Sequence, residues 1–436
     1  MSERKMIYLC LAHMSETGME QKYVKEAFDT DWVVPMGPNV NAFEADLEAF
    51  VNARDFSTQP SASLEMTDWD DRRVVCLSAG TAAVHLALIA CGVKAGDEVL
   101  VQSFTFCASS HPITYLGAKP VFIDSERDTW NMDPELLEKA IVERKEATGQ
   151  YPKAIIPVAL YGMPYDCEKI MAIADKYGIP VIEDAAEGMG SRFNGQVLGT
   201  FGRFGVLSFN GNKMITTSGG GALICRSAED ANEIMWYATQ ARDAYPYYEH
   251  TAIGYNYRMS NVCAGIGRGQ MTVLDDHIAH HKHVQQLYRE LLADVPGVTL
   301  HDQPADGRYD SNFWLCAATL DPSVKIVGQE NAYKEVIKSA VGGAAGIIHS
   351  VTCPTTDCQP NDNVEALRVF MLDKKVECRP VWKPMHKQPV YADAVAYVNG
   401  VSEEIFKVGF CLPAGPYVTD EDVKYIVECI KEAIVK

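Results

Sequence analysis

The chain has 436 residues, of which 39 are lysine or arginine and 58 are aspartate or glutamate, giving a formal net charge of −19. This acidic balance argues against binding to nucleic acid or to an acidic membrane, because a phosphate backbone requires a basic surface. Apolar residues make up 47% of the chain, and no apolar run reaches about 18 residues, so we expect a globular protein without a membrane span.

Length and cysteine content indicate how the chain is organised. A chain of this length exceeds one ordinary hydrophobic core. We expect a large domain with an N-terminal arm over residues 1–284 and a small C-terminal domain over residues 285–436. The 13 cysteines are scattered and odd in number, which is typical of reduced thiols and predicts a cytoplasmic protein.

The N-terminal region is predicted to contain two helices. Amphipathic spacing marks Gly18–Phe28 and Val40–Val51, and the turn Trp32–Pro38 separates them. Residues 52–72 are polar and lack periodicity, so we expect an exposed insertion there.

A strand followed by a helix then forms a candidate anion site. Val74–Leu77 has the pattern of a strand, and the helix after it begins within Ser-Ala-Gly-Thr-Ala-Ala. A helix N-terminus presents free backbone amides and the positive end of its dipole, so Gly80, Thr81 and Ala82 are candidates for a phosphate cradle. Taken alone, the motif is explained better by an ordinary strand-to-helix turn.

Strands and helices alternate over the following hundred residues, which predicts a largely parallel sheet covered on both faces. One helix begins at Pro134 after the N-cap Asp133, and the next ends at Gly178. Strands are predicted at Glu98–Val101, Pro120–Ile123, Ala154–Leu160 and from Ile179.

Three polar or aromatic positions stand at the ends of these strands. Phe106, in Ser-Phe-Thr-Phe, either stacks on a flat ring or fills the core. Asp184 ends an apolar strand at the edge where open α/β sheets build their sites, and its carboxylate either holds a cationic ring nitrogen or caps a turn. Lys213 lies between a strand and a glycine run, where a desolvated amine can form a Schiff base with a carbonyl.

A lysine, a carboxylate and a phosphate cup are together what a pyridoxal phosphate enzyme requires. The motifs also follow a recognisable order: Ser-Ala-Gly-Thr-Ala-Ala, Ser-Phe-Thr-Phe, Pro-Val-Phe-Ile-Asp, Leu-Tyr-Gly-Met-Pro, Ile-Glu-Asp-Ala-Ala-Glu, Phe-Asn-Gly-Asn-Lys and Gly-Tyr-Asn-Tyr-Arg-Met-Ser. This succession resembles the DegT/DnrJ/EryC1/StrS family of sugar aminotransferases over most of residues 5–275 and again over 377–430. The resemblance implies an aspartate-aminotransferase-like α/β fold (fold type I), with a mixed, mostly parallel sheet flanked by helices and a smaller C-terminal α/β domain.

The resemblance also implies roles for individual residues. Lys213 would bind pyridoxal 5'-phosphate and act as the catalytic base, and Asp184 would pair with the cofactor's ring nitrogen. Glu187 stands near the cofactor where most members have His or Gln, and its contact is open. Further cofactor contacts are implied for Gly80, Thr81, Ala82, Phe106, Ser208 and Asn256.

Of these residues, Asn256 would reach the phosphate from the other subunit, which implies a homodimer with shared active sites. Substrate contacts are implied for His13, Arg258, Lys383 and His386, although loop capping and surface charge explain each of them equally well. We predict no metal site at His277, His280, His281 and His283, because a third ligand and a reason for burial are lacking.

The C-terminal part is predicted to form a helix over Lys282–Leu292, strands over Phe313–Leu320 and Val376–Arg379, and a last helix opened by Thr419. Residues 339–363 form an irregular insertion.

The loop around Lys213 and the stretch Arg379–Gln388 resemble family members that aminate a bacillosamine precursor. The implied reaction transfers the amino group of L-glutamate to C4 of UDP-2-acetamido-2,6-dideoxy-α-D-xylo-hexos-4-ulose, a nucleotide-linked 4-keto-6-deoxy sugar, and releases 2-oxoglutarate. The alternatives are a GDP-perosamine synthase-type 4-aminotransferase and a non-catalytic sensor. The lysine at position 213 disfavours the family's dehydratase branch, which has His there.

Overall fold

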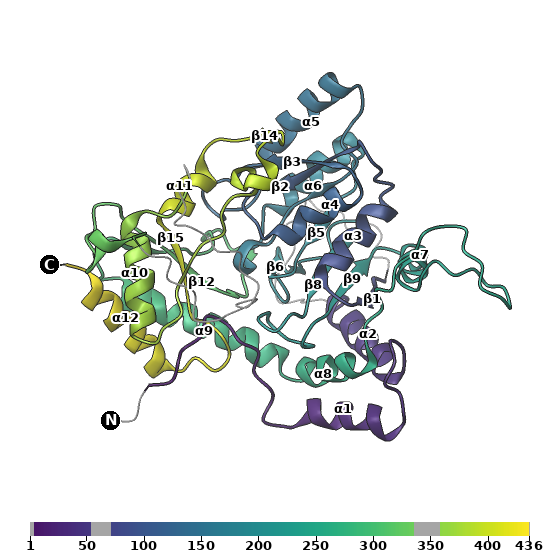
Figure 1. Cartoon of the computed structure of the whole chain (residues 1–436), viewed down its shortest axis with the longest axis horizontal. Coiled ribbons are helices and arrows are strands. Elements are labelled where there is room, and N and C mark those ends of the chain that lie inside the picture. The colour runs from purple at the N-terminus through teal and green to yellow at the C-terminus, as the bar shows by residue number, and fades with distance from the viewer. Residues whose placement is uncertain (1–3, 54–70, 335–357, 436) are drawn as a thin grey trace.

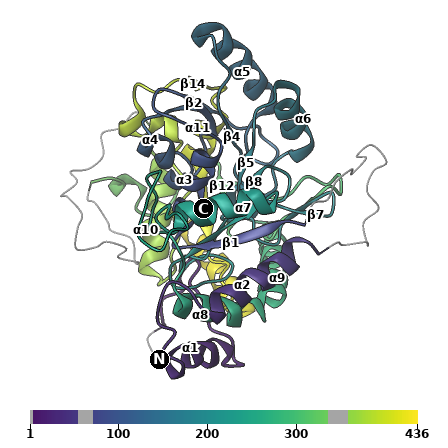
Figure 2. The ribbon, with the colours of Figure 1, turned by 90° about the vertical axis from the view of Figure 1, so that its right-hand side faces the viewer.

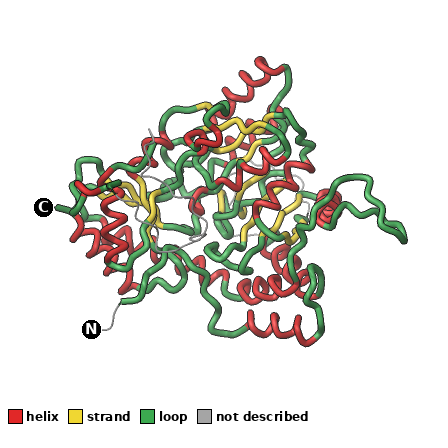
Figure 3. The backbone as a smooth tube through the Cα atoms, viewed as in Figure 1, coloured by secondary structure: helices red, strands yellow, loops and turns green. Residues whose placement is uncertain are grey.

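The computed structural model describes residues 4–53, 71–334 and 358–435. Most of the two predicted insertions, 52–72 and 339–363, lies outside these residues, which are the coloured parts of Figure 3. Within them, no helix has both the length and the apolar character needed to cross a bilayer.

The larger lobe is built on two four-stranded sheets that meet at β4 (Ile155–Ile156) and β5 (Ile182–Asp184), both labelled in Figure 2. Bridges from Ile155 to Val181 and from Val158 to Asp184 join the sheets edge to edge. One sheet has the order β1 (Arg73–Leu77), β9 (Gly221–Cys225), β8 (Phe204–Ser208) and β5 (Ile182–Asp184). The other has the order β14 (Ala396–Tyr397), β3 (Lys119–Ile123), β2 (Glu98–Gln102) and β4 (Ile155–Ile156).

Most pairings in these sheets are parallel, and β9 alone among the eight strands runs antiparallel to both of its neighbours. The mixed, mostly parallel sheet that the family resemblance implies is therefore present. Parallel pairing brings the carboxyl ends of β5 and β8 to the same edge, which places Asp184 and Ser208 close to each other.

Helices cover both faces of the sheet, because successive strand residues point to opposite sides. In β1, Val74 and Cys76 pack on one side, while Val75 and Leu77 pack on the other. The first side is covered by α2 (Pro38–Val51), α5 (Pro134–Thr148) and α6 (Cys167–Tyr177). The second side is covered by α3 (Gly80–Ala90), α4 (His111–Tyr115) and α7 (Ala228–Ala238), as Figure 2 helps to show.

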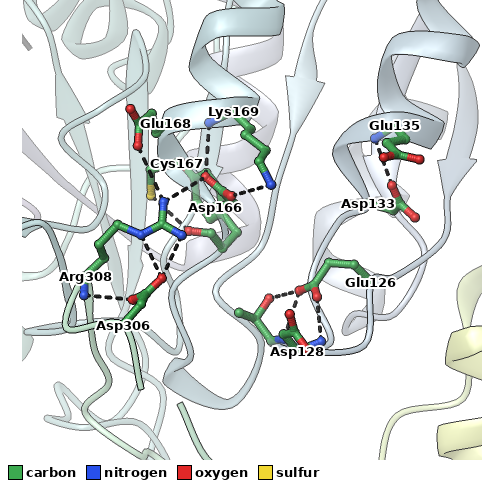
Figure 4. A network of polar contacts seen from close by, with 12 residues as sticks. Glu126, Asp128, Asp133, Glu135, Asp166, Cys167, Glu168, Lys169, Asp306 and Arg308 are labelled. Atoms are coloured by element: carbon green, nitrogen blue, oxygen red, sulfur yellow. Dashed lines mark hydrogen bonds and ion pairs between the residues drawn. The ribbon is translucent and has the colours of Figure 1, made fainter. Parts of the chain in front are cut away.

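Local sequence explains where several helices begin. Asp133 accepts hydrogen bonds from the backbone N–H groups of Glu135 and Leu136 at the start of α5, as its N-cap position predicts. Asp166 accepts from Lys169 N–H at the start of α6 (Figure 4). Gly178, with φ 65°, ends α6 in a left-handed conformation that glycine adopts without strain.

The same close-up shows a group of ion pairs around Arg308. The Arg308 guanidinium lies 2.8 Å from Asp306, 3.5 Å from Glu168 and 4.0 Å from Asp166 (Figure 4). These contacts join the loop before β11 (Tyr309–Asp310) to the start of α6. Strand β11 itself pairs with β6 (Arg192–Phe193), which in turn pairs with β7 (Gln196–Val197).

The smaller lobe contains an antiparallel sheet and carries both termini in Figure 1. Its strands are β10 (Val298–Leu300), β12 (Cys316–Leu320), β15 (Gly409–Leu412) and β13 (Arg379–Pro380). Its core includes residues of α9 (Leu274–Leu292), α10 (Asp362–Asp373) and α12 (Asp420–Ala433). Thr419 and Asp422 form the capping box predicted for α12.

The remaining elements complete the two lobes. The helices are α1 (Met19–Asp29), α8 (Asn261–Met271) and α11 (Val401–Val408). Short 3-10 turns lie at Cys107–Ser109, Leu160–Gly162, Gln329–Asn331, Met385–Lys387 and Pro389–Tyr391. The predicted domain boundary at residue 284 falls inside α9, and β14 returns from the C-terminal part to the larger lobe.

Candidate active site

A cavity of about 400 Å³ opens at the carboxyl ends of β5 and β8. This is the edge of an open α/β sheet at which ligand sites form. The volume is within the range of small-molecule pockets. Its wall includes these predicted cofactor contacts: Gly80, Thr81, Phe106, Asp184, Glu187, Ser208 and Lys213.

One end of the cavity is the N-terminus of α3. By position, the first amides of this helix have no intrahelical partner, so they remain available to an anion. Ser208 lies beside them, because a Cβ on Gly80 would be 3.2 Å from the Ser208 Cβ. A Cβ on Gly221 would collide with the backbone at Gly80, which explains why β9 begins with a glycine. Ala82 is buried in the same turn but does not contribute to the cavity wall.

Asp184 supplies a buried carboxylate at the end of β5. It accepts a hydrogen bond of 2.6 Å from the Ser109 hydroxyl and one of 3.2 Å from the Ala186 N–H. Burial raises the pKa of Asp184, and these two donors together with the charge of Lys213 oppose the rise. The Ser109 hydroxyl is in turn 2.8 Å from that of Thr105. Ser109 was not predicted from the sequence. The only signal for it was its position shortly after the aromatic loop.

The Lys213 side chain lies between a carboxylate and an aromatic ring. Its Nζ is 3.3 Å from Glu187 Oε1 and 4.1 Å from the centre of the Trp314 ring. The other carboxylate oxygen of Glu187 accepts a 2.8 Å hydrogen bond from the Tyr161 N–H. Burial raises the pKa of Glu187, and the charge of Lys213 and the hydrogen bond from the Tyr161 N–H oppose this rise. The contact left open for Glu187 is therefore with Lys213.

Phe106 forms part of the cavity wall, whereas its neighbour Phe104 fills the core. Phe104 is fully buried and Phe106 is 50% exposed. The Phe106 ring lies 5.4 Å from that of Trp382, which also borders the cavity. An exposed aromatic face at this position can stack on a flat ligand. Trp382 lies in the stretch 379–388 that sequence analysis singled out, but Trp382 itself was not predicted.

Two predicted substrate contacts take part in other interactions. The Arg258 guanidinium pairs with Glu44 and donates a 2.8 Å hydrogen bond to the Cys76 carbonyl, with 8% of its side chain exposed. His386 Nδ1 is 2.6 Å from the Ser103 hydroxyl, and its Nε2 is 3.2 Å from Glu403. Both side chains connect segments of the fold and neither borders the cavity.

The other predicted contacts also lie away from the cavity wall that the described residues form. His13 is exposed, and its carbonyl accepts a hydrogen bond from Gln270. Lys383 is half-buried. Asn256 is exposed and forms a backbone bridge with Thr239. A single chain thus does not bring these three residues into the cavity.

The histidines of α9 contact backbone carbonyls. His277 Nδ1 is 3.1 Å from Met214 O, and His281 Nδ1 is 3.1 Å from Phe313 O. His280 Nε2 is 3.2 Å from Gly415 O. Across residues 4–53, 71–334 and 358–435, no group of three or more candidate ligands is placed to hold a metal ion.

The arrangement suits a flat, phosphate-bearing carbonyl compound with a cationic ring. The α3 amides and Ser208 match a phosphate, Phe106 offers an aromatic face, and Asp184 offers a buried negative charge. Lys213 presents a primary amine to the same space. These are the groups that a site for pyridoxal phosphate requires.

Comparisons with known proteins agree with this chemistry. The model of the DegT/DnrJ/EryC1/StrS aminotransferase family matches residues 69–342 and 329–431. EpsN of Bacillus subtilis (strain 168), named for pyridoxal phosphate-dependent aminotransferase activity, is 39% identical over 430 residues, covering 98% of this chain and 95% of EpsN. The GDP-perosamine synthase of Escherichia coli O157:H7 is 31% identical over 427 residues, covering 98% and 99%.

Among solved structures, a DegT DnrJ EryC1 StrS aminotransferase from Brucella abortus superposes with a TM-score of 0.77 at 24% identity, covering 95% of each chain. This likeness confirms the predicted fold class.

Proposed function

Because the chain belongs to the DegT/DnrJ/EryC1/StrS aminotransferase family, we propose that it moves an amino group from L-glutamate onto C4 of a nucleotide-linked keto sugar. The observation that supports this most directly is the Lys213 amine, which borders the same cavity as the buried Asp184 carboxylate and the N-terminus of α3. No single one of these groups is specific, but together they match one cofactor.

In this proposal the cofactor is pyridoxal 5'-phosphate. When bound, it supplies an aldehyde that accepts the amino group and a ring that withdraws electrons from the donor's α-carbon. Asp184 would hold the ring nitrogen protonated, and burial makes that ion pair strong. The amides of Gly80 and Thr81 and the Ser208 hydroxyl would hold the phosphate, and Phe106 would stack on the ring.

Lys213 would act twice in each catalytic cycle. With the donor bound, the Lys213 Nζ would take the proton from the donor's α-carbon and give it to the carbon of the bound cofactor that carries the amino nitrogen. With the keto sugar bound, the same Nζ would move a proton in the opposite direction, to C4 of the sugar. Glu187, 3.3 Å away, keeps the released amine within the cavity.

The sugar nucleotide we propose is UDP-2-acetamido-2,6-dideoxy-α-D-xylo-hexos-4-ulose. Support comes from the sequence of the lysine loop and of the stretch Arg379–Gln388. A specific observation favours a second candidate, since a GDP-perosamine synthase is 31% identical over 98% of this chain. The second candidate substrate is therefore the corresponding GDP-linked 4-keto-6-deoxy sugar.

Incubation of the purified protein with glutamate and a panel of UDP- and GDP-linked 4-keto-6-deoxy sugars tests the proposal. We expect amination of the UDP sugar with release of 2-oxoglutarate, visible absorbance from the lysine–cofactor bond, and loss of both in Lys213→Ala. Arg258→Lys is a matched control, because that cation lies outside the cavity. Turnover of GDP sugars alone would replace the UDP assignment, and bound cofactor without any turnover would favour the non-catalytic sensor.

We also propose a homodimer whose subunits complete each other's sites. The loop between α7 and α8 projects from the body of the molecule in Figure 1. The exposed Asn256 lies at the base of this loop, where it bridges Thr239 at the end of α7. A single chain leaves apolar side chains exposed there and near α1, which a second copy would cover. The most exposed of these are Phe28, Met36, Tyr247, Tyr248 and Ile253.

A further inference from the structure

We propose that Trp314 positions the catalytic amine and thereby sets the rate of proton transfer at Lys213. This inference rests on the proposed function, and it adds a residue to which no role has been given above. Trp314 precedes β12, is 1% exposed as a whole residue, and still contributes to the cavity wall. It touches the lysine loop in two separate ways.

The first contact is with the amine itself. Lys213 Nζ lies 4.1 Å from the centre of the Trp314 ring, well inside the distance of about 6 Å at which an ammonium is attracted to an indole face. Glu187 Oε1 holds the same nitrogen at 3.3 Å. The carboxylate and the ring together restrict the position of the amine. With the carboxylate alone, the amine could still rotate about that single contact.

The second contact is with the backbone of the lysine loop. The Trp314 indole N–H donates a 2.7 Å hydrogen bond to the carbonyl of Asn212, the residue directly before Lys213. One side chain therefore fixes both ends of the lysine, its nitrogen through the ring face and its Cα through the loop. Trp314 and Asn212 are 102 positions apart in sequence, so this contact is made only by tertiary structure.

Trp314 can act as a reference point because the segment that carries it is itself held rigidly. The Asn312 side-chain oxygen accepts a hydrogen bond from the backbone N–H of Trp314, and its side-chain nitrogen donates to the carbonyls of Glu187 and Met189, each at 2.9 Å. Phe313 between them has φ 47°, a left-handed conformation that a bulky residue adopts only when its surroundings impose it. Its carbonyl is bonded by His281 at 3.1 Å.

The consequence concerns proton transfer more than binding. In the proposed reaction Lys213 must leave the cofactor and then meet two different carbon atoms at bonding distance. Misplacement of a reacting group by about 1 Å can cost about 100-fold in rate. Loss of the ring face and of the loop hydrogen bond should therefore lower kcat while leaving KM for the nucleotide sugar unchanged.

Two variants separate the two contacts. Trp314→Phe keeps an aromatic face and removes the indole N–H, and Trp314→Leu removes both. Trp130→Phe and Trp130→Leu are matched controls, because Trp130 is a buried tryptophan that stacks on His301 and lies outside the cavity wall. Circular dichroism and thermal melting identify any variant that fails to fold.

The first readout needs no cofactor. In the apoprotein, carbamylation of Lys213 by cyanate at one fixed pH, followed by peptide mass spectrometry, reports how freely the amine moves. We expect labelling about threefold faster or more in Trp314→Leu and near the wild-type rate in Trp314→Phe, because a ring still covers the amine. Both Trp130 variants should label at the wild-type rate.

The second readout uses the holoenzyme. We expect kcat to fall about 100-fold in Trp314→Leu and about 10-fold in Trp314→Phe, with KM for the nucleotide sugar unchanged and an altered visible band of the lysine–cofactor bond. Wild-type labelling, kcat and spectrum in a folded Trp314→Leu would overturn the inference. If Trp314→Leu does not fold, a wild-type kcat and spectrum in Trp314→Phe would overturn it instead. A wild-type enzyme that neither binds cofactor nor turns over would contradict the proposed function. Cyanate labelling of the apoprotein would still test the contact between Trp314 and Lys213, because it needs no cofactor.

Discussion

At the scale of single residues, the candidate site places two buried carboxylates near one amine. Asp184 and Glu187 differ in their partners, because Asp184 accepts from Ser109 while Glu187 pairs with Lys213. Burial raises the pKa of both carboxyl groups, so each depends on its donors to remain charged. The donor to Asp184 gives the simplest test.

Removal of the Ser109 hydroxyl should weaken cofactor binding. The hydroxyl donates at 2.6 Å to Asp184 and opposes the upward shift of its pKa. A hydrogen bond to a charged group contributes about 1.5–3 kcal/mol, so Ser109→Ala should lower the affinity for pyridoxal phosphate about 10-fold or more. A fluorescence titration measures this directly.

The pH dependence of that binding has a defined sign. Only the ionised Asp184 pairs with a cationic ring, and losing a donor raises its pKa further. As the pH is lowered, the affinity for pyridoxal phosphate should therefore begin to fall at a higher pH in Ser109→Ala than in wild type. Ser110→Ala is the control, since that buried hydroxyl contacts Cys107 and Met385 instead. If both variants had the same affinity for pyridoxal phosphate and lost it over the same acidic pH range, the role of Ser109 would be contradicted.

At the scale of elements, α9 contacts the two segments that carry Lys213 and Trp314. His277 contacts the Met214 carbonyl in the lysine loop, and His281 contacts the Phe313 carbonyl in the segment before β12. His281 is fully buried, and its Nε2 has no hydrogen-bond partner among the residues that the structure describes. Burial without a partner disfavours the charged imidazolium and lowers the pKa of His281 to about 3.

His281 should make the fold sensitive to acid. Its pKa falls from the ordinary 6.5 to about 3, so between these values the unfolded chain binds a proton that the folded chain does not. The free energy of unfolding should then fall by up to about 1.4 kcal/mol per pH unit as the pH drops below 6.5. Denaturant titrations of wild type and His281→Gln over this range measure the difference.

We expect His281→Gln to be less stable at neutral pH but to lose stability more slowly on acidification, because glutamine does not titrate. His283→Gln is the control, since its exposed imidazole pairs with Asp420 at the surface. A parallel acid response in wild type and His281→Gln would show that another group governs the effect.

At the scale of the whole molecule, one chain does not bring Asn256 into its own cavity. Because Asn256 is exposed and lies outside the wall of that cavity, a site that includes it would need a second copy. We expect dimers by light scattering, with neither Lys213→Ala nor Asn256→Ala active alone. Mixing and refolding the two variants together should restore measurable activity, since one heterodimer site would contain both native residues.

Glu249→Gln mixed with Lys213→Ala controls for assembly, because Glu249 lies on the same projecting loop and its position is exposed. Strictly monomeric protein with full activity would refute the shared site.

The sequence alone determined those features that depend on neighbouring residues. Asp133 and Thr419 cap helices where their positions predict, because a cap requires only the next three residues. Asp184 and Lys213 were singled out because each follows an apolar strand, and carboxyl ends of parallel strands meet at one edge.

Only the tertiary structure decided the partners of these groups. Ser109 meets Asp184 across 75 positions, and Trp314 meets the lysine loop across 102. Equally, Arg258 and His386 looked like substrate contacts until packing placed them against Glu44 and Ser103. The physical reason is that strand and helix patterns record which face is buried, whereas the partner of a buried polar group depends on how distant segments pack.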